Sequence, residues 1–175
     1  MGFVTQPERP DDHNPITNIH RQAFGRDNEG RLVHRLRREQ QLLLSLVTTD
    51  GDKAVAHIAF SPVTLSGSSR AASLPTGAAL GPVGVLPSYQ GNGLGLQIIE
   101  AALASDAITQ TPWQVLVGEP SLYGRFGFGA ASQYGLKCEF QVPPEYFLLR
   151  VTPGIEPPVF EQGETLHYHK AFHSV

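Results

Sequence analysis

A glycine-rich turn between an apolar run and an amphipathic segment constrains this chain more than any other stretch. The apolar run ends in residues 83–86 (VGVL), Pro87 stops it, and residues 90–95 (QGNGLG) lead into apolar positions at helical spacing. The pattern predicts a strand, a turn and a helix that begins near Leu94. Glycines at 91, 93 and 95 leave consecutive backbone N–H groups uncovered. At the positive end of a helix dipole, such groups form an anion site suited to a phosphate or pyrophosphate.

The spacing of the glycines narrows the choice of ligand. The dinucleotide fingerprint G-x-G-x-x-G would need glycine where Leu96 or Ile98 stands, and no Gly-Lys pair completes a Walker pattern. A nucleotide- or dinucleotide-binding protein is therefore disfavoured. The pattern that is present is Q-x-x-G-x-G, formed by Gln90, Gly93 and Gly95. It resembles the acyl-CoA-binding turn of the GCN5-related N-acetyltransferase (GNAT) superfamily, whose signature is [RQ]-x-x-G-x-[GA].

A second block stands in the order that the same family shows. The β-branched run at 114–117 is followed by GEPSLYGRFGF, which contains Tyr123 and the pair Gly127-Phe128. In the GNAT family, the strand after the cofactor helix leads to a short helix with a tyrosine, and a Gly-Phe pair opens the next strand. With AHIAFSPV at 56–63 and HYHKAF at 167–172, the chain resembles a bacterial subfamily of uncharacterised predicted N-acetyltransferases across almost its whole length.

Composition limits the class of protein and its partners. A chain of 175 residues predicts one domain, here a single N-acetyltransferase domain over residues 1–175. The single cysteine, Cys138, excludes an internal disulfide and a cysteine-based zinc site. A net charge of −3 offers no attraction to nucleic acid, and no apolar run is long enough for a membrane span. The N-terminal residues lack the pattern of a signal peptide, so we expect a cytoplasmic protein. The sequence leaves open whether the protein forms a homodimer.

The rest of the chain predicts alternating strands and helices. We expect an edge strand at 3–10, a helix with Pro15 at its first position that ends near Gly25, and a helix over 29–40. Strands over 42–49 and 53–65 are joined by Asp50-Gly51, a hairpin signal. Further strands are expected near 114–117, 130–140 and 147–151, with His167 and His169 alternating on a terminal strand. The resemblance implies an α/β GNAT fold, in which helices flank a mixed, mostly antiparallel sheet that splays at the acyl-CoA cleft.

The resemblance also implies where the cosubstrate acetyl-CoA lies. The pantetheine arm is expected beside the backbone of Val83, Gly84 and Val85, where an N–H polarises the thioester carbonyl. The pyrophosphate is expected on backbone N–H groups of the turn, which comprises Gln90, Gly91, Asn92, Gly93, Leu94 and Gly95. The arginines at 31, 35, 37 and 38 are expected on a solvated helix face, with phosphate binding as the alternative.

Three side chains are candidates for proton transfer. Tyr123 occupies the family position that protonates the leaving thiolate, and its alternative role is packing. Glu119 is the first choice for the general base that deprotonates the amine. His57 is the second choice, although a hydrogen-bonded core histidine is the stronger interpretation. His167 and His169 lack an evident third ligand, so no metal is expected.

The expected activity is acetyl transfer from acetyl-CoA to a primary amine of a small molecule or a protein, by direct attack on the thioester. The alternative is a catalytically silent CoA-binding sensor or interaction module. The chain departs from many family members where Gly118-Glu119-Pro120 replaces an asparagine near the tyrosine helix. Cofactor contacts on that side therefore stay open.

Overall fold

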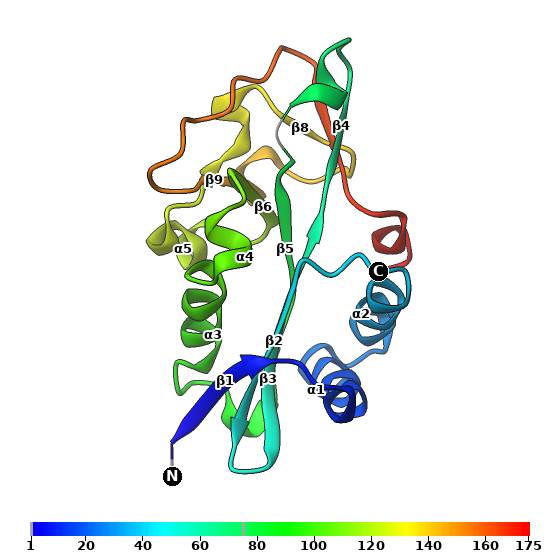
Figure 1. Cartoon of the computed structure of the whole chain (residues 1–175), viewed down its shortest axis with the longest axis vertical. Helices are drawn as coiled ribbons and strands as arrows, with labels where there is room; N and C mark the ends of the chain where they lie inside the picture. Colours follow the sequence, from blue (N-terminus) through cyan, green and yellow to red (C-terminus); the bar gives the residue numbers. More distant parts are fainter. Residues whose placement is uncertain (1, 75) are drawn as a thin grey trace. The chain divides into compact units, whose positions relative to one another are not determined.

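The computed structural model describes residues 2–74 and 76–175 (Figure 1). Within them the chain forms two compact units. Of the described residues, the first unit comprises 2–61, Leu80–Ile108 and Lys170–Val175, and the second comprises 62–74, 76–79 and Thr109–His169. None of the helices in these described ranges is long and apolar enough to cross a membrane.

The first unit is built on four strands in the order β1-β2-β3-β5. The edge strand β1 (Phe3–Pro7) pairs antiparallel with β2 (Leu44–Asp50), and β2 pairs antiparallel with β3 (Lys53–Pro62). The expected hairpin at Asp50-Gly51 joins β2 to β3, and Gly51 takes the positive φ that such a turn requires. Strand β5 (Ala78–Val85) begins in the second unit and continues into the first.

Helices cover both faces of these strands. As a result, β3 is buried almost along its whole length. Helices α1 (His13–Phe24) and α2 (Asn28–Arg38) lie on one side and α3 (Leu94–Leu103) on the other (Figure 1). Ile16 of α1 packs against Val33 and Val47. The short 3-10 turns η1 (Pro10–Asp12), η3 (Pro87–Tyr89) and η7 (Lys170–Ser174) complete the unit.

The helix ends follow their sequence signals with one exception. Gly25 caps α1 in the left-handed conformation, as expected for a glycine that follows a helix. Pro15 was expected at the first helical position and stands at the third, because η1 precedes the helix and α1 already begins at His13. Proline is tolerated there because the N–H groups of the first turn have no intrahelical partner.

The second unit contains strands in the order β5-β6-β9-β7. Ala78 and Ala79 of β5 pair in parallel with β6 (Trp113–Val117), and this pair makes the sheet mixed, as expected. Strands β9 (Phe147–Val151) and β7 (Gly129–Ala130) add antiparallel pairs. A second sheet has the order β4-β10-β8, from β4 (Thr64–Ser66), β10 (Thr165–His167) and β8 (Lys137–Cys138).

Short helical turns make up much of the rest of this unit. They are η2 (Ala71–Ser73), α5 (Pro120–Tyr123), η4 (Gly124–Phe126), η5 (Ala131–Tyr134) and η6 (Pro144–Tyr146), and α4 (Asp106–Thr109) leads into it.

Two strand expectations in this unit were wrong. The region 130–140 was expected as one strand, and instead η5 and a left-handed Gly135 interrupt it, leaving the two-residue strand β8. Strand β10 ends at His167, so His169 does not alternate with it on a strand. In both places a turn competes with the extended chain.

Candidate functional site

The glycine turn forms the N-terminus of α3 with the backbone geometry that its glycines permit. Gly91 and Gly93 have φ values of 79° and 77°, in the left-handed region that a side chain disfavours. Gly93 is the N-cap of α3. The first intrahelical bond runs from Gln97 N to Gly93 O at 3.0 Å, so the N–H groups of residues 94–96 point out of the helix end. This arrangement favours an anion at the turn.

The side chains of the turn brace it from both ends. Leu94 is buried with Ile19, Val55 and Leu86, which anchors the first residue of α3 in the core. On the outer side, Gln90 Nε2 donates to the carbonyl of Val85 at 3.0 Å. The amide of Asn92 donates more weakly to the Tyr89 carbonyl at 3.4 Å. Both amides therefore support the loop in this structure, and their contact with a cofactor stays a prediction.

Strand β5 carries the residues expected beside the thioester. Val83 and Val85 are half-buried, and Gly84 between them is buried. A Cβ placed on Gly84 would lie 2.9 Å from His20 Nδ1 and 3.5 Å from the Cβ of Ala23 on α1. Glycine at 84 thus lets α1 approach the strand closely. For Gly95, a Cβ would lie 3.7 Å from Val85, an ordinary contact.

His57 lies inside the first unit, where hydrogen bonds occupy both ring nitrogens. Its Nδ1 is 2.8 Å from Nε2 of His20, and its Nε2 is 2.8 Å from the hydroxyl of Ser45. Complete burial lowers the pKa of His57 well below its usual 6.5, and the charges of His20 and Arg37 act in the same direction. The ring is therefore neutral at pH 7. A core role is favoured by this geometry, and direct contact with an amine stays a prediction.

Tyr123 and Glu119 lie in the second unit, around the start of α5. Tyr123 is 9% exposed, its ring meets Phe128 edge-on at 6.1 Å, and burial raises the pKa of its hydroxyl. A Cβ on Gly118 would lie 2.6 Å from the tyrosine ring, so glycine there makes room for it. Glu119 is exposed and is the N-cap residue of α5, and its carbonyl accepts the N–H of Tyr123 at 3.2 Å. One side chain is thus a buried acid and the other an exposed carboxylate.

Two of the arginines of α2 are engaged by carboxylates. Arg35 lies 2.9 Å from Glu39, and Arg37 binds Glu8 through two hydrogen bonds of 2.6 and 2.8 Å. Arg37 is largely buried, so the expected solvated face does not extend to it. Among the described residues, no cluster of histidine, cysteine and acidic side chains has the geometry to hold a metal.

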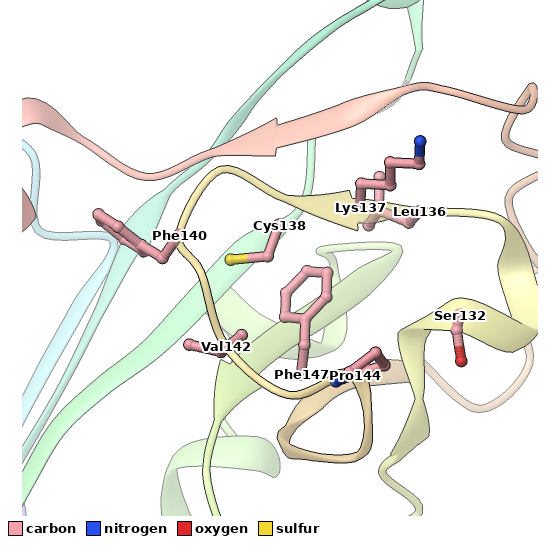
Figure 2. Close-up of a pocket in the computed structure, with 8 residues that line it drawn as sticks. All are labelled: Ser132, Leu136, Lys137, Cys138, Phe140, Val142, Pro144 and Phe147. Carbon is pink, nitrogen blue, oxygen red and sulfur yellow. The ribbon is translucent and has the colours of Figure 1, made fainter.

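A pocket of about 260 Å³ lies in the second unit, and none of the predicted site residues lines it. Its lining is mainly apolar and comprises Ser132, Leu136, Lys137, Cys138, Phe140, Val142, Pro144 and Phe147. Figure 2 shows the Lys137 side chain pointing away from the ring of Phe147. Burial raises the pKa of Cys138, so this thiol is not an activated nucleophile.

The sequence analysis missed three residues that the fold brings to His57. They are His20 on α1, Ser45 on β2 and Glu8 just after β1. Their separations from His57 along the chain are 37, 12 and 49 residues, and no local motif links them. The available signal was weak: a histidine on the apolar face of a helix and another in an apolar strand.

The mixed sheet, its flanking helices and the glycine turn at the start of α3 define an acetyltransferase fold. The family model described as "Acetyltransferase (GNAT) domain" matches residues 6–131, and the chain belongs to this family of acyltransferases. Among curated proteins it is 34% identical over 141 residues to the uncharacterised N-acetyltransferase YhbS of Escherichia coli, covering 79% of this chain and 80% of that protein. It is 29% identical over 138 residues to the uncharacterised N-acetyltransferase YjhQ of the same organism.

Solved structures agree with this assignment. The crystal structure of E. coli YhbS in complex with CoA superimposes with a TM-score of 0.81 and 30% identity, covering 98% of this chain and 92% of that one. A GNAT family acetyltransferase from Brucella melitensis in complex with acetyl-CoA gives a TM-score of 0.76 and 32% identity, covering 98% of each chain. The expected α/β GNAT fold, with a mixed and mostly antiparallel sheet, is therefore confirmed.

Proposed function

We propose that this protein binds acetyl-CoA at the 90–95 turn and transfers the acetyl group to a primary amine of a small molecule or a protein. The observation that carries the proposal is the N-terminus of α3, where Gly93 caps the helix with φ 77° and the next N–H groups point outward. The complexes of the relatives with CoA and acetyl-CoA support the choice of ligand. We take residues 1–175 as one acetyltransferase domain.

The proposed mechanism assigns one task to each group. The N–H groups of the turn hold the pyrophosphate, and the backbone of β5 holds the pantetheine arm and polarises the thioester carbonyl. The amine attacks the carbonyl carbon and forms the C–N bond. As the tetrahedral intermediate collapses and the C–S bond breaks, Tyr123 gives its proton to the sulfur. Its raised pKa keeps the phenol protonated at neutral pH, as an acid requires.

Thermal unfolding with acetyl-CoA tests the binding step. A ligand that binds the folded state raises the melting temperature. We expect such a rise for the parent and its loss in Gly93→Val, because valine is strained at positive φ and covers the N–H groups. Gly25→Val is the matched control, since Gly25 has a φ of 69° and open space around it at the far end of α1. If Gly93→Val keeps the acetyl-CoA shift, the turn is not the cofactor site.

A turnover assay separates the enzyme from a silent CoA-binding module. Release of the CoA thiol is followed with acetyl-CoA and a panel of primary amines, and mass spectrometry identifies the acetylated product. We expect amine-dependent CoA release from the parent. If acetyl-CoA raises the melting temperature of the parent but no amine causes release of CoA, the protein is the catalytically silent CoA-binding module.

A further inference from the structure

Four polar side chains from four parts of the fold form a continuous hydrogen-bonded row inside the first unit. Glu8 Oε2 is 2.5 Å from the hydroxyl of Ser45, which is 2.8 Å from His57 Nε2. His57 Nδ1 is 2.8 Å from His20 Nε2, and the two imidazole rings are perpendicular. Both histidines are fully buried, whereas the carboxylate of Glu8 is 14% exposed. The row therefore joins the core of the unit to its surface.

The chemistry of the groups sets the direction of every hydrogen bond. An ionised carboxylate only accepts, so Ser45 donates to Glu8 and its oxygen accepts from Nε2–H of His57. Nδ1 of His57 then lacks a proton and accepts from Nε2–H of His20. Burial raises the pKa of Glu8, but hydrogen bonds from Arg37 and Ser45 outweigh it and the pKa lies below its ordinary value. Glu8 is therefore ionised, and the row ends in an unprotonated Nδ1 on His20.

That terminal nitrogen faces strand β5. His20 Nδ1 is buried and has no hydrogen-bond partner among the described residues. A Cβ on Gly84 would lie 2.9 Å from it, so this nitrogen lies beside the backbone of Gly84. Buried polar atoms normally have a partner. This one is held at the strand on which the thioester is expected, and its basic lone pair is unused by the protein.

We propose that His20 is the proton acceptor of the acetyl transfer and that His57, Ser45 and Glu8 form the relay that returns the proton to solvent. The inference rests on the function proposed above. It differs from the expected general bases, because His57 here acts through His20 and Glu119 has no part in it.

Each proton transfer has a named donor and acceptor. The Tyr123 phenolate regains its proton from solvent, and the row regains its starting tautomers when the shifts below run in reverse after product release. The attacking nitrogen becomes acidic as its lone pair forms the C–N bond, and it gives one proton to Nδ1 of His20, the atom that lies against Gly84. His20 passes its Nε2 proton to Nδ1 of His57, and His57 passes its Nε2 proton to the oxygen of Ser45. Ser45 passes its hydroxyl proton to Glu8, and the partly exposed acid releases it to solvent.

The surroundings of His20 keep it in the base form. Burial lowers its pKa to about 4, against an opposing effect of the Glu29 carboxylate on α2. Glu29 itself is held by Arg26 at 3.0 Å, and the Phe24 ring stacks on His20 from α1. The other neighbours of His20 carry no charge: they are the neutral ring of His57 on β3 and the backbone of Gly84 on β5. A neutral imidazole of low basicity is suited to a proton that leaves only when the C–N bond has formed.

Two variants test the relay with acetyl-CoA and a panel of primary alkylamines as the probe. His20→Gln removes the base, and we expect kcat to fall on the order of 10²-fold or more while KM for acetyl-CoA stays unchanged. Ser45→Ala removes one hydroxyl from a part-buried site and breaks the link to Glu8, so a smaller loss is expected even if His20→Gln folds poorly. His34→Gln is the matched control, because His34 is exposed on α2.

The pH profile separates a base from a packing residue. Hydroxide replaces a missing base, so the ratio of parent to variant kcat should shrink as pH rises from about 7 to 9. A ratio that stays constant with pH, or an unchanged kcat in both variants, overturns the relay.

Nitrogen-15 NMR of the histidine-labelled parent gives a readout that needs no acceptor. We expect an unprotonated Nδ1 and a protonated Nε2 on His20, and the reverse tautomer overturns the relay alone. A parent that transfers acetyl to no amine contradicts the proposed function instead, so the two failures are distinguishable.

Discussion

At the scale of single residues, Tyr123 is the position where family resemblance and physical environment agree. Its ring fills the space that Gly118 leaves open and meets Phe128 edge-on. Burial of the ring raises the pKa of the hydroxyl, which keeps the proton that a departing thiolate needs. The same burial also suits a packing residue, so geometry alone does not separate the two roles.

Replacing Tyr123 by phenylalanine separates them, because the substitution keeps the ring and removes the hydroxyl. If Tyr123 protonates the thiolate, Tyr123→Phe should lower kcat on the order of 10²-fold with little effect on acetyl-CoA binding. Steady-state CoA release is the measurement. Tyr146→Phe is the control, since Tyr146 is an exposed tyrosine of the same unit. Unchanged turnover in Tyr123→Phe, where chemistry limits the rate, would remove the hydroxyl from the mechanism.

At the scale of elements, the close packing of α1 on β5 depends on one glycine. The imidazole of His20 lies where a side chain on Gly84 would stand. The hydrogen bond from His20 to His57 holds the ring in that place, so helix, strand and histidine pair are positioned together. The contact explains why a β-strand interior contains glycine, which otherwise weakens a strand.

Gly84→Ala should therefore destabilise the fold, by about 1–3 kcal/mol, because the added methyl group overlaps a buried ring that is held on its other side. Urea unfolding of parent and variant measures the change. Gly95→Ala is the matched control, since its methyl group would make an ordinary contact at 3.7 Å with Val85 and alanine favours the helix in which Gly95 lies. Equal stability of Gly84→Ala and the parent would contradict the packing described for α1 and β5.

At the scale of the whole molecule, the two buried histidines link folding to pH. Burial lowers the pKa of His20 from 6.5 to about 4 and lowers that of His57 in the same direction. Between these values the unfolded chain binds more protons than the native protein, so stability increases with pH there. The contribution is complete above pH 6.5 and is lost as the pH falls toward 4.

We expect the free energy of unfolding to fall by about 3 kcal/mol through His20 alone between pH 6.5 and 4, with His57 adding to the loss. Urea unfolding at half-unit pH steps measures the slope. In His20→Gln the stability at pH 7 should be lower but its slope below pH 6.5 smaller. The exposed His34→Gln control should keep the slope of the parent. A parent whose stability is flat across this range would contradict the buried neutral pair.

Local order could be read from the sequence because each signal acts within a few residues. The turn at Gln90–Gly95, the hairpin at Asp50-Gly51 and the cap at Gly25 depend on backbone conformations that glycine permits, and all three have the expected form. The strand predicted over 130–140 was wrong, because the strand preference of this region was weak and a left-handed Gly135 favours a turn. The family, and with it the fold, followed from two motifs in the right order.

The row from Glu8 to His20 was decided by tertiary structure alone. Its members are far apart in sequence, and each taken singly is a common residue in a common setting. The sheet places Ser45 and His57 on neighbouring strands, and α1 brings His20 to them across Gly84. Hydrogen-bond direction and pKa depend on burial and on partners that only the folded chain provides. The sequence by itself therefore determined the family and its cofactor turn, whereas the direction of a proton path depends on side chains that meet only in the folded protein.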